Sequence, residues 1–411
     1  MTRDLKSKLT GDLKSKLTGD LLFFISYGLF LVTSILNASF FYKYFVGKPY
    51  MRIQSLCIFL LLIYEICSNG WRKQNWLGLL VCTVLGWITI RVSPAYAQRQ
   101  VVWMFAYIYS ARNIPFAKIA RFTLNASIAV VLAVVVSSFF GVVESIAAYK
   151  NGRIREYLGF RYALYLPGLL LNMTALWVYV KKDTITVTGT LVWAVANVLV
   201  FWLTDSRISF FIAEALLAAG LLMRYFPKVL DKLKVIWALA AGSFALCTVF
   251  SLLITVLYDS SLPWMRKLNS MLESRLRLGH ASLQEFGVKW FGQEILWLGN
   301  GLDAYGNSTV GTYNYVDCMY VKILQRYGIV FVVLWLAMIC WGMYRMYKRK
   351  EYHILLISAT VAAHCVLDDL SLTLHYNTFW MALGVILMNP KMLDWNGKTT
   401  QIAPKLEPQN E

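Results

Sequence analysis

Acidic residues, histidines and metal-binding patterns are scarce in this chain. Its 411 residues include 22 Asp and Glu against 40 Lys and Arg, and 4 His. The 7 cysteines form no CxxC pair and no Cys/His ligand spacing, so neither a disulfide framework nor a metal site is expected. The sequence also contains no phosphate-binding nucleotide loop and no dinucleotide fingerprint. We therefore expect no metal, no cofactor and no ATP hydrolysis.

Hydrophobic residues dominate the composition, at 58% of the chain. A helix needs about 20 mostly apolar residues to span a hydrocarbon core roughly 30 Å thick, and such runs recur throughout. The sequence predicts an all-α, polytopic integral membrane protein with about twelve transmembrane helices. The predicted helices cover residues 21–42, 51–68, 75–91, 99–110, 122–142, 162–180, 187–204, 206–224, 234–257, 328–346, 351–369 and 374–389.

The formal net charge of +18 does not indicate a nucleic-acid binder. Such proteins gather Lys and Arg on one continuous soluble face, whereas here they are scattered through short segments between apolar runs. The distribution follows the positive-inside rule when both termini are cytoplasmic. We therefore expect a multi-pass protein that contacts a lipid bilayer and no nucleic acid.

Five regions follow from these patterns. Residues 1–20 form a basic cytoplasmic tail that contains two identical copies of the octapeptide DLKSKLTG, and 390–411 form a second polar tail. Nine transmembrane helices occupy 21–257, and three occupy 328–389. Between them, 258–327 is the one long hydrophilic stretch, which we predict to be a large extracytoplasmic loop.

That loop is rich in arginine and aromatic residues. The leucine spacing within 268–287 predicts an amphipathic helix on the outer membrane surface, with Arg275 and Arg277 off its apolar stripe. Residues 316–327 are predicted to form a helix that enters the next span. Cationic groups beside acids and aromatic faces suit an anionic, sugar-bearing substrate attached to lipid.

Further charges lie where the bilayer makes charge costly. Asp205 and Arg207 at a predicted outward turn form either an interfacial ion pair or part of an anion site. Glu65 and Glu214 are single acids within spans and are expected to pair with neighbouring helices.

Two more polar clusters are predicted to face outward. The segment 151–168 contains Arg153, Arg155 and Arg161 and is either an anion-binding loop or a solvated loop. The segment 364–380 holds polar side chains that cap a bend or line an outer cavity. Those residues are His364, Asp368, Asp369, His375 and Asn377.

Several short motifs resemble a known family. They are IYSARNIPFAKI, TDSRISFF, SRLRLGHASLQEFGVKWFGQEI, VDCMYVKILQRYGI and HYNTFW, which begin at residues 108, 204, 274, 316 and 375. In order and spacing around one large loop, they resemble the Wzy-like repeat-unit polymerases of bacterial surface polysaccharides. The resemblance is greatest to the capsular and exopolysaccharide branch of Gram-positive bacteria, and covers most of 100–390.

The resemblance implies a C-type glycosyltransferase-like fold in the bacterial plasma membrane. The implied reaction polymerises undecaprenyl-pyrophosphate-linked oligosaccharide repeat units at the outer face, without metal, into capsular, exopolysaccharide or O-antigen-like chains. Implied partners are the lipid-linked oligosaccharide, a flippase and a chain-length regulator. Candidate catalytic residues are Asp317 and His280 as bases and Arg275 as a stabilising cation. Candidate pyrophosphate-binding residues are Arg153, Arg155, Arg161, Arg207, Arg277, Lys289, Lys322, Arg326, His375 and Asn377.

Two other functions fit the same composition. An O-antigen-type ligase would transfer glycan from the same carrier, but such ligases usually place a histidine near the position of Asp317. A flippase or transporter of lipid-linked oligosaccharide would line a path through both leaflets with charge. Here the unexplained charges gather on one side.

Overall fold

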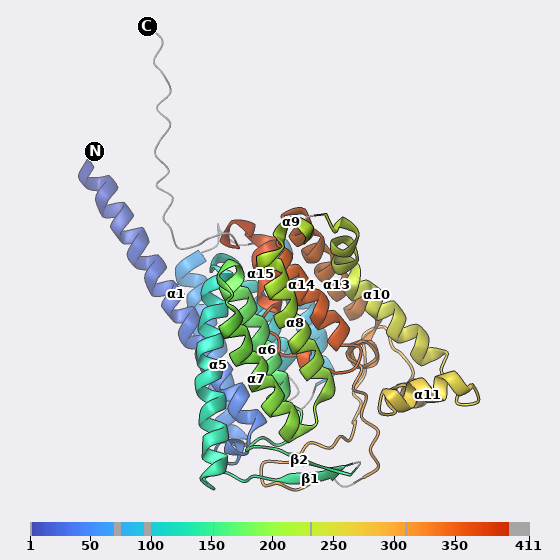
Figure 1. Ribbon diagram of the computed structural model, residues 1–411. Coiled ribbons are helices and arrows are strands. Elements are labelled where there is room, and N and C mark those ends of the chain that lie inside the picture. Colours follow the sequence, from blue (N-terminus) through green and yellow to red (C-terminus); the bar gives the residue numbers. More distant parts are fainter. Residues whose placement is uncertain are drawn as a thin grey trace.

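A bundle of helices forms the body of the protein in the computed structural model (Figure 1). The structure describes residues 2–69, 75–93, 100–150, 152–230, 232–308 and 311–393. The first helix begins at the upper left of Figure 1, and a small β-hairpin lies at the opposite, lower end. We call these the N-terminal end and the hairpin end of the bundle.

The described residues include fifteen α-helices and two strands. The helices before the hairpin are α1 (Thr2–Ala38), α2 (Lys48–Tyr64), α3 (Trp76–Arg91), α4 (Gln100–Ser110) and α5 (Phe116–Phe139). The strands β1 (Ala147–Lys150) and β2 (Arg153–Glu156) pair antiparallel. The helices that follow are α6 (Tyr165–Lys181), α7 (Val187–Thr204), α8 (Arg207–Tyr225), α9 (Pro227–Leu230), α10 (Lys234–Val256), α11 (Pro263–Met271), α12 (Arg275–Phe286), α13 (Met319–Lys348), α14 (Tyr352–His364) and α15 (Trp380–Met388).

Seven helices in the described part of the chain are long and apolar enough to cross a membrane. They are α1 from Gly19, α2 with its extension to Ser68, α5, α7, α8, α10 and α13. The shorter helices α3 and α14 are also apolar. The predicted class, an all-α polytopic membrane protein, is therefore confirmed. Each predicted span overlaps one helix, although α4 and α15 are far shorter than a bilayer requires.

Buried polar pairs join helices that are distant in sequence. The Ser26 hydroxyl lies 2.8 Å from the Tyr107 hydroxyl, between α1 and α4. The Asn172 amide donates to the Thr378 hydroxyl at 3.0 Å, from α6 to the segment before α15. Such bonds hold membrane helices together where the hydrophobic effect contributes little. Glu65 pairs with Arg112 at 2.8 Å, which confirms that this acid has a partner from another part of the bundle.

A break in α13 ties the loop of 257–318 to the bundle. Gly328 has φ 88° and ψ 177°, a backbone region open only to glycine. The interrupted turn leaves main-chain groups that bond to the loop: Ile329 N–H donates to the Lys289 carbonyl at 3.2 Å and Val330 N–H to the Trp290 carbonyl at 3.1 Å. The loop backbone therefore packs directly against α13. Residues 316–327 were predicted to form a helix that enters the next span, and α13 begins within this stretch.

The predicted single amphipathic helix at 268–287 is wrong. Two helices, α11 and α12, occupy this stretch, because Glu273 and Ser274 between them take left-handed φ values of 50° and 69°. The break resets the helical phase. Arg275 now points inward, with only 10% of its side chain exposed, instead of lying off an apolar stripe.

One further prediction needs correction, and two predicted regions have secondary structure that the sequence analysis did not specify. The polar cluster at 151–168 includes the strand β2, which pairs antiparallel with β1. The predicted final span 374–389 is helical only from Trp380, since residues 373–379 form turns. The predicted tail 1–20 is helical from Thr2 and extends α1 beyond the bundle (Figure 1). Most of the predicted tail 390–411 lies outside the described residues.

We predict that Gly328→Ala destabilises the protein. A β-carbon on Gly328 would lie 2.3 Å from Gly292 N and 2.5 Å from the Lys289 carbonyl oxygen, in addition to the unfavourable backbone angles. The expected cost is on the order of 3 kcal/mol. Gly242→Ala in α10 is the matched control, because its β-carbon meets nothing nearer than 3.9 Å. Thermal unfolding in detergent measures both variants, and equal midpoints would contradict the assigned role of Gly328.

Candidate functional site

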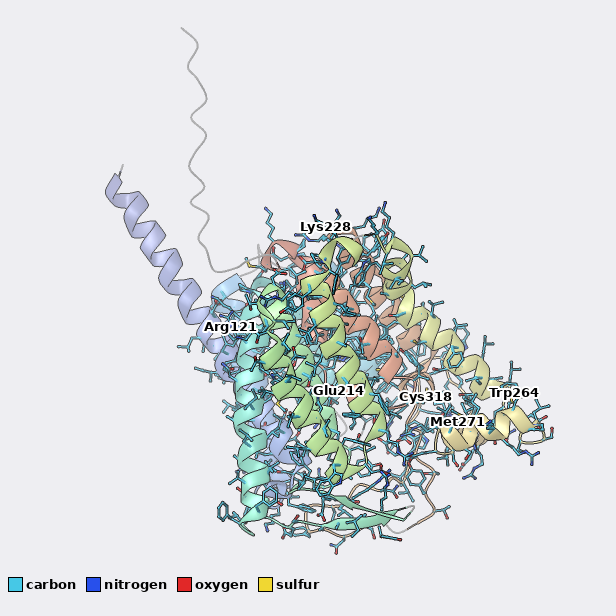
Figure 2. The ribbon with its side chains drawn as sticks, viewed as in Figure 1. Arg121, Glu214, Lys228, Trp264, Met271 and Cys318 are labelled. Carbon is cyan, nitrogen blue, oxygen red and sulfur yellow. The ribbon has the colours of Figure 1, made fainter. Side chains whose placement is uncertain are left out.

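The site is at the hairpin end, where α12, α13 and the segment after α14 meet. Figure 2 shows Cys318, the residue before α13, between the bundle and the projecting α11, which carries Trp264 and Met271. A small apolar cluster of Tyr258, Met265 and Leu276 joins α11 and α12 to the end of α10. This packing fixes the position of Arg275 next to the bundle.

Arg275 and Asp317 form the centre of the site. The Arg275 Nε lies 3.5 Å from Asp317 Oδ2, and both side chains are mostly buried. The Tyr313 hydroxyl donates to the same carboxylate oxygen at 3.4 Å. Two of the three predicted catalytic residues are therefore in contact, although more than forty residues separate them in the chain.

Two further carboxylates accompany Asp317. Asp368 and Asp369 follow α14, and we call the three acids the carboxylate cluster. Asp369 forms an ion pair with Lys322 on α13 and accepts a hydrogen bond from the Tyr315 hydroxyl at 3.0 Å. Lys322 also contacts the Tyr315 hydroxyl and lies 5.5 Å from the centre of the Trp297 ring. Lys322 is 7% exposed, so its charge is committed to Asp369.

Burial alters proton affinity in this cluster. Desolvation raises the pKa of Asp317 to about 7, while the neighbouring Arg275 guanidinium lowers it and the charges of Asp369 and Asp368 raise it further. Burial, and then the charge of Asp369, also raise the pKa of Asp368. A carboxylate that titrates near neutral pH can accept a proton from a substrate hydroxyl and release it again.

A second group of charges lies beside the carboxylate cluster. We call Arg153, Arg155 and Arg207 the arginine cluster, because all three contact Asp205, at 2.8, 3.3 and 3.4 Å. Asp205 ends α7 in a left-handed conformation and is 6% exposed. The predicted Asp205–Arg207 ion pair is present, and two arginines from the hairpin join it.

The arginine cluster has free capacity for an anion. The side chains of Arg153 and Arg207 are 58% and 59% exposed, so each guanidinium keeps donors that Asp205 does not use. Arg155 is mostly buried and reaches Glu273, at 3.9 Å. Since Glu273 lies two residues before Arg275, Arg155 connects the arginine cluster to the carboxylate cluster.

Three tyrosine rings pack in a row beside charged groups of both clusters. The rings of Tyr157 and Tyr162 have centroids 6.5 Å apart, and those of Tyr162 and Tyr165 are 5.5 Å apart. Burial and the charge of Asp317 raise the pKa of Tyr162, so its hydroxyl stays protonated. Rings with protonated hydroxyls offer apolar faces and hydrogen-bond donors at the same place.

His280 lies away from Asp317. Its Nδ1 is 2.9 Å from the Thr255 carbonyl oxygen on α10, and its Nε2 is 2.9 Å from the Gln284 amide nitrogen. The phase of α12 explains this orientation, because Arg275 and His280 lie five residues apart and face different sides of the helix. His280 is thus a neighbour of α10 and does not contact the carboxylate cluster.

Several predicted pyrophosphate residues have other contacts or lie apart. Arg161 donates to the carbonyls of Asn37 and Leu302, and so ties the end of α1 to the loop. Arg326 donates to the Ile295 carbonyl at 2.6 Å and lies 5.0 Å from the Trp297 ring centre. Arg277 and Lys289 are exposed on the loop surface.

His375 and Asn377 are buried within the turn before α15. Burial lowers the pKa of His375 to about 3, so its ring is neutral. The Asn377 side-chain oxygen accepts the Phe379 N–H at 3.2 Å, which caps the following turn. Both residues thus support the fold of the segment that carries Asp368 and Asp369.

The sequence had assigned no role to Tyr313, Tyr315 or Glu273, and it had placed Asp368 and Asp369 only at a bend or an outer cavity. Two signals were available. The first is that the adjacent acids at 368 and 369 follow an apolar run. The second is that Tyr313, Tyr315 and Asp317 are spaced two residues apart, which places their side chains on one side of an extended segment. No group of His, Cys, Asp and Glu in the described part of the chain is arranged to hold a metal ion.

Comparisons with protein-family models, curated proteins and solved structures find no match to this chain.

We predict that Lys322→Met destabilises the protein and that Lys289→Met does not. Removing the buried Lys322 leaves Asp369 without its cation, at an expected cost of about 3–5 kcal/mol. Lys289 is exposed, so its replacement is expected to change the free energy of unfolding by less than about 0.5 kcal/mol. The double variant Lys322→Met/Asp369→Asn is expected to recover part of the loss. Equal unfolding midpoints for the two single variants would show that Lys322 is not held as described.

Proposed function

We propose that this protein polymerises lipid-pyrophosphate-linked oligosaccharide repeat units by glycosyl transfer at the outer face of the bacterial plasma membrane. The observation that carries the proposal is the contact between Arg275 and Asp317 at the hairpin end. A cation for a developing negative charge and a carboxylate with a pKa near 7 are the two groups such a transfer needs. The family resemblance of the motifs supports the same reaction.

The reaction assigns a role to each cluster. The acceptor sugar hydroxyl oxygen bonds to the anomeric carbon of the donor, and the bond from that carbon to the pyrophosphate oxygen breaks. The lipid pyrophosphate leaves with the electron pair, and Asp317 takes the hydroxyl proton. Arg153 and Arg207, which are more than half exposed, bind the pyrophosphate, while Arg275 stabilises charge near the reacting centre.

The proposed topology has twelve spans, and the hairpin end faces outward. The loop of 257–318, with α11 and α12, is then the large extracytoplasmic loop, and both termini are cytoplasmic. The basic segments at the N-terminal end support this orientation, because short cytoplasmic loops are enriched in Lys and Arg.

Chain elongation by purified protein tests the proposal. The substrate is the lipid-linked repeat unit alone, and the product is a ladder with one-unit spacing on a gel. We predict that Asp317→Asn lowers elongation by about 10²–10⁴-fold, because it removes the proton acceptor. His280→Ala is the matched variant and is expected to retain activity within about threefold, because its ring contacts Thr255, Gln284 and the Tyr258 ring and none of the carboxylate cluster.

Two outcomes would overturn these assignments. Loss of elongation in His280→Ala with full activity in Asp317→Asn would exchange the roles of the two residues. An intact substrate with folded wild-type protein would favour a ligase or a flippase over a polymerase.

Elongation is also expected to depend on pH through Asp317. Below its pKa of about 7 the carboxyl is protonated and cannot accept the hydroxyl proton, so the rate should rise as pH increases through 7 and then level off. His280→Ala should keep the same midpoint, which excludes the histidine as the titrating group. A rate that falls as pH rises from 6 to 8 would contradict Asp317 as the base.

A further inference from the structure

The helix α11 projects sideways from the bundle at the end of α10 (Figures 1 and 2). At the rise of an α-helix, the 23 residues of α10 extend over about 34 Å, close to the thickness of a bilayer core of roughly 30 Å. Only the short segment 257–262 separates the end of α10 from the start of α11. We therefore place α11 at the level of the membrane surface.

One face of α11 is packed, and this packing fixes the rotation of the helix about its axis. Met265 and Asn269 are both buried, and residues four apart share a face of a helix. Met265 packs against Tyr258 and Leu276, at the end of α10 and in α12. The Asn269 side-chain oxygen accepts the Arg277 N–H at 3.0 Å. The directions of the other faces of α11 are therefore determined.

A second face of α11 is apolar and exposed. Trp264 and Met271 are 57% and 72% exposed, and a spacing of seven residues places them within about 20° of each other around the helix. Leu253, Val256 and Leu257 at the end of α10 are also more than half exposed, on a helix long and apolar enough to span a membrane. Tryptophan is enriched where hydrocarbon meets lipid headgroups. The exposed face of α11 thus continues the membrane-facing flank of α10.

Two cations on α11 are available to an anion. Arg266 and Lys267 are exposed, and neither side chain forms an ion pair or a hydrogen bond within the part of the chain that the structure describes. The nearby acid Asp259 accepts both the N–H and the hydroxyl of Ser261. Around the helix, Lys267 lies about 60° from Trp264, whereas Arg266 lies about 160° from it. With Trp264 inserted in a bilayer, Lys267 therefore lies at the depth of the lipid phosphates and Arg266 faces water.

We infer that α11 is a surface anchor that binds the anionic phospholipids of the bilayer. Trp264 and Met271 enter the region of the acyl chains, and Lys267 contacts a lipid phosphate. Because α11 continues into α12 through the left-handed turn at 273–274, the bilayer then holds the loop that carries Arg275. This anchoring is independent of the proposed reaction, since it requires only a membrane with negative charge.

Fluorescence quenching tests the insertion of the apolar face. A bimane is attached at Met271→Cys in the full-length protein, with Cys67→Ser to remove the exposed native thiol, and single copies are placed in phosphatidylglycerol nanodiscs. Phosphatidylglycerol with brominated chains is expected to quench this bimane at least about twofold, because interfacial helices bury their apolar face about 5–10 Å deep. A bimane at Arg266→Cys, on the opposite face, is the matched control and is expected to lose less than about a tenth of its emission.

Hydrogen exchange tests the preference for anionic lipid. At low ionic strength, the amides of α11 are expected to exchange about fivefold more slowly in phosphatidylglycerol nanodiscs than in phosphatidylcholine nanodiscs. Lys267→Glu is expected to abolish this difference, and Lys267→Gln is the second variant should the first not fold. Lys48→Glu makes the same change of charge at an exposed position on α2 and is expected to keep the difference.

Three results would overturn the anchor. An unquenched bimane at Met271→Cys, or equal quenching at the two labelled positions, would show that this face does not enter the bilayer. Equal exchange of the α11 amides in the two lipids would exclude recognition of a negative headgroup. Slow exchange that appears only in nanodiscs with two copies would identify a second chain as the occupant of this face.

Discussion

The main-chain junction between residues 289–293 and the interrupted turn of α13 holds the loop against the helix that carries Lys322 and Arg326. Gly328 leaves the helical conformation, and the freed donors bond to the loop backbone at Lys289 and Trp290. From the other side, Gln293 N–H donates to the Arg326 carbonyl at 3.0 Å. Main-chain bonds of this kind tolerate little displacement, so the loop cannot move away from the helix without breaking several of them.

The loop held by this junction also contributes the aromatic ring that lies beside the buried cations of α13. Trp297 is held by a bond from its ring nitrogen to the Ser282 hydroxyl, at 3.1 Å, and it lies next to both Lys322 and Arg326. The aromatic face and the carboxylates together offset the cost of burying these cations. Burial of an isolated, charged carboxylate is unfavourable. In Asp317 the same burial raises the pKa to about 7, so that both protonation states are populated near neutral pH.

The sequence was sufficient for the helices but only partly for the site. Long apolar runs predict helices because a helix satisfies its own backbone in a bilayer, whereas the strands of a closed barrel are shorter and alternate in polarity, and each predicted segment overlaps a helix. Arg275 and Asp317 could be chosen as candidate catalytic residues because so many charged residues close to a membrane require an explanation. Their contact could not be predicted, since it depends on a left-handed turn at Glu273 and Ser274 that no local propensity requires.

Other predicted phosphate-binding residues have intramolecular partners that come from distant parts of the chain. Lys322 was read as a phosphate ligand, but Asp369, nearly fifty residues further along, neutralises it. Arg161 was read in the same way, although carbonyls from α1 and the loop occupy its donors. The sequence identifies a positively charged side chain in a loop. The carboxylate or carbonyl group that accepts its hydrogen bonds is known only from the folded structure.

Arg155 has a consequence for the order of events. It contacts Asp205 on one side and Glu273 on the other, and Glu273 precedes the residue that pairs with Asp317. An anion that binds Arg155 must compete with one or both acids, so occupancy of the hairpin changes the forces on the turn that orients Arg275. Because such linkage is reciprocal, the protonation of Asp317 must in turn alter the affinity of the hairpin for its anion. In the proposed reaction, donor binding and acceptor activation would then be thermodynamically coupled steps.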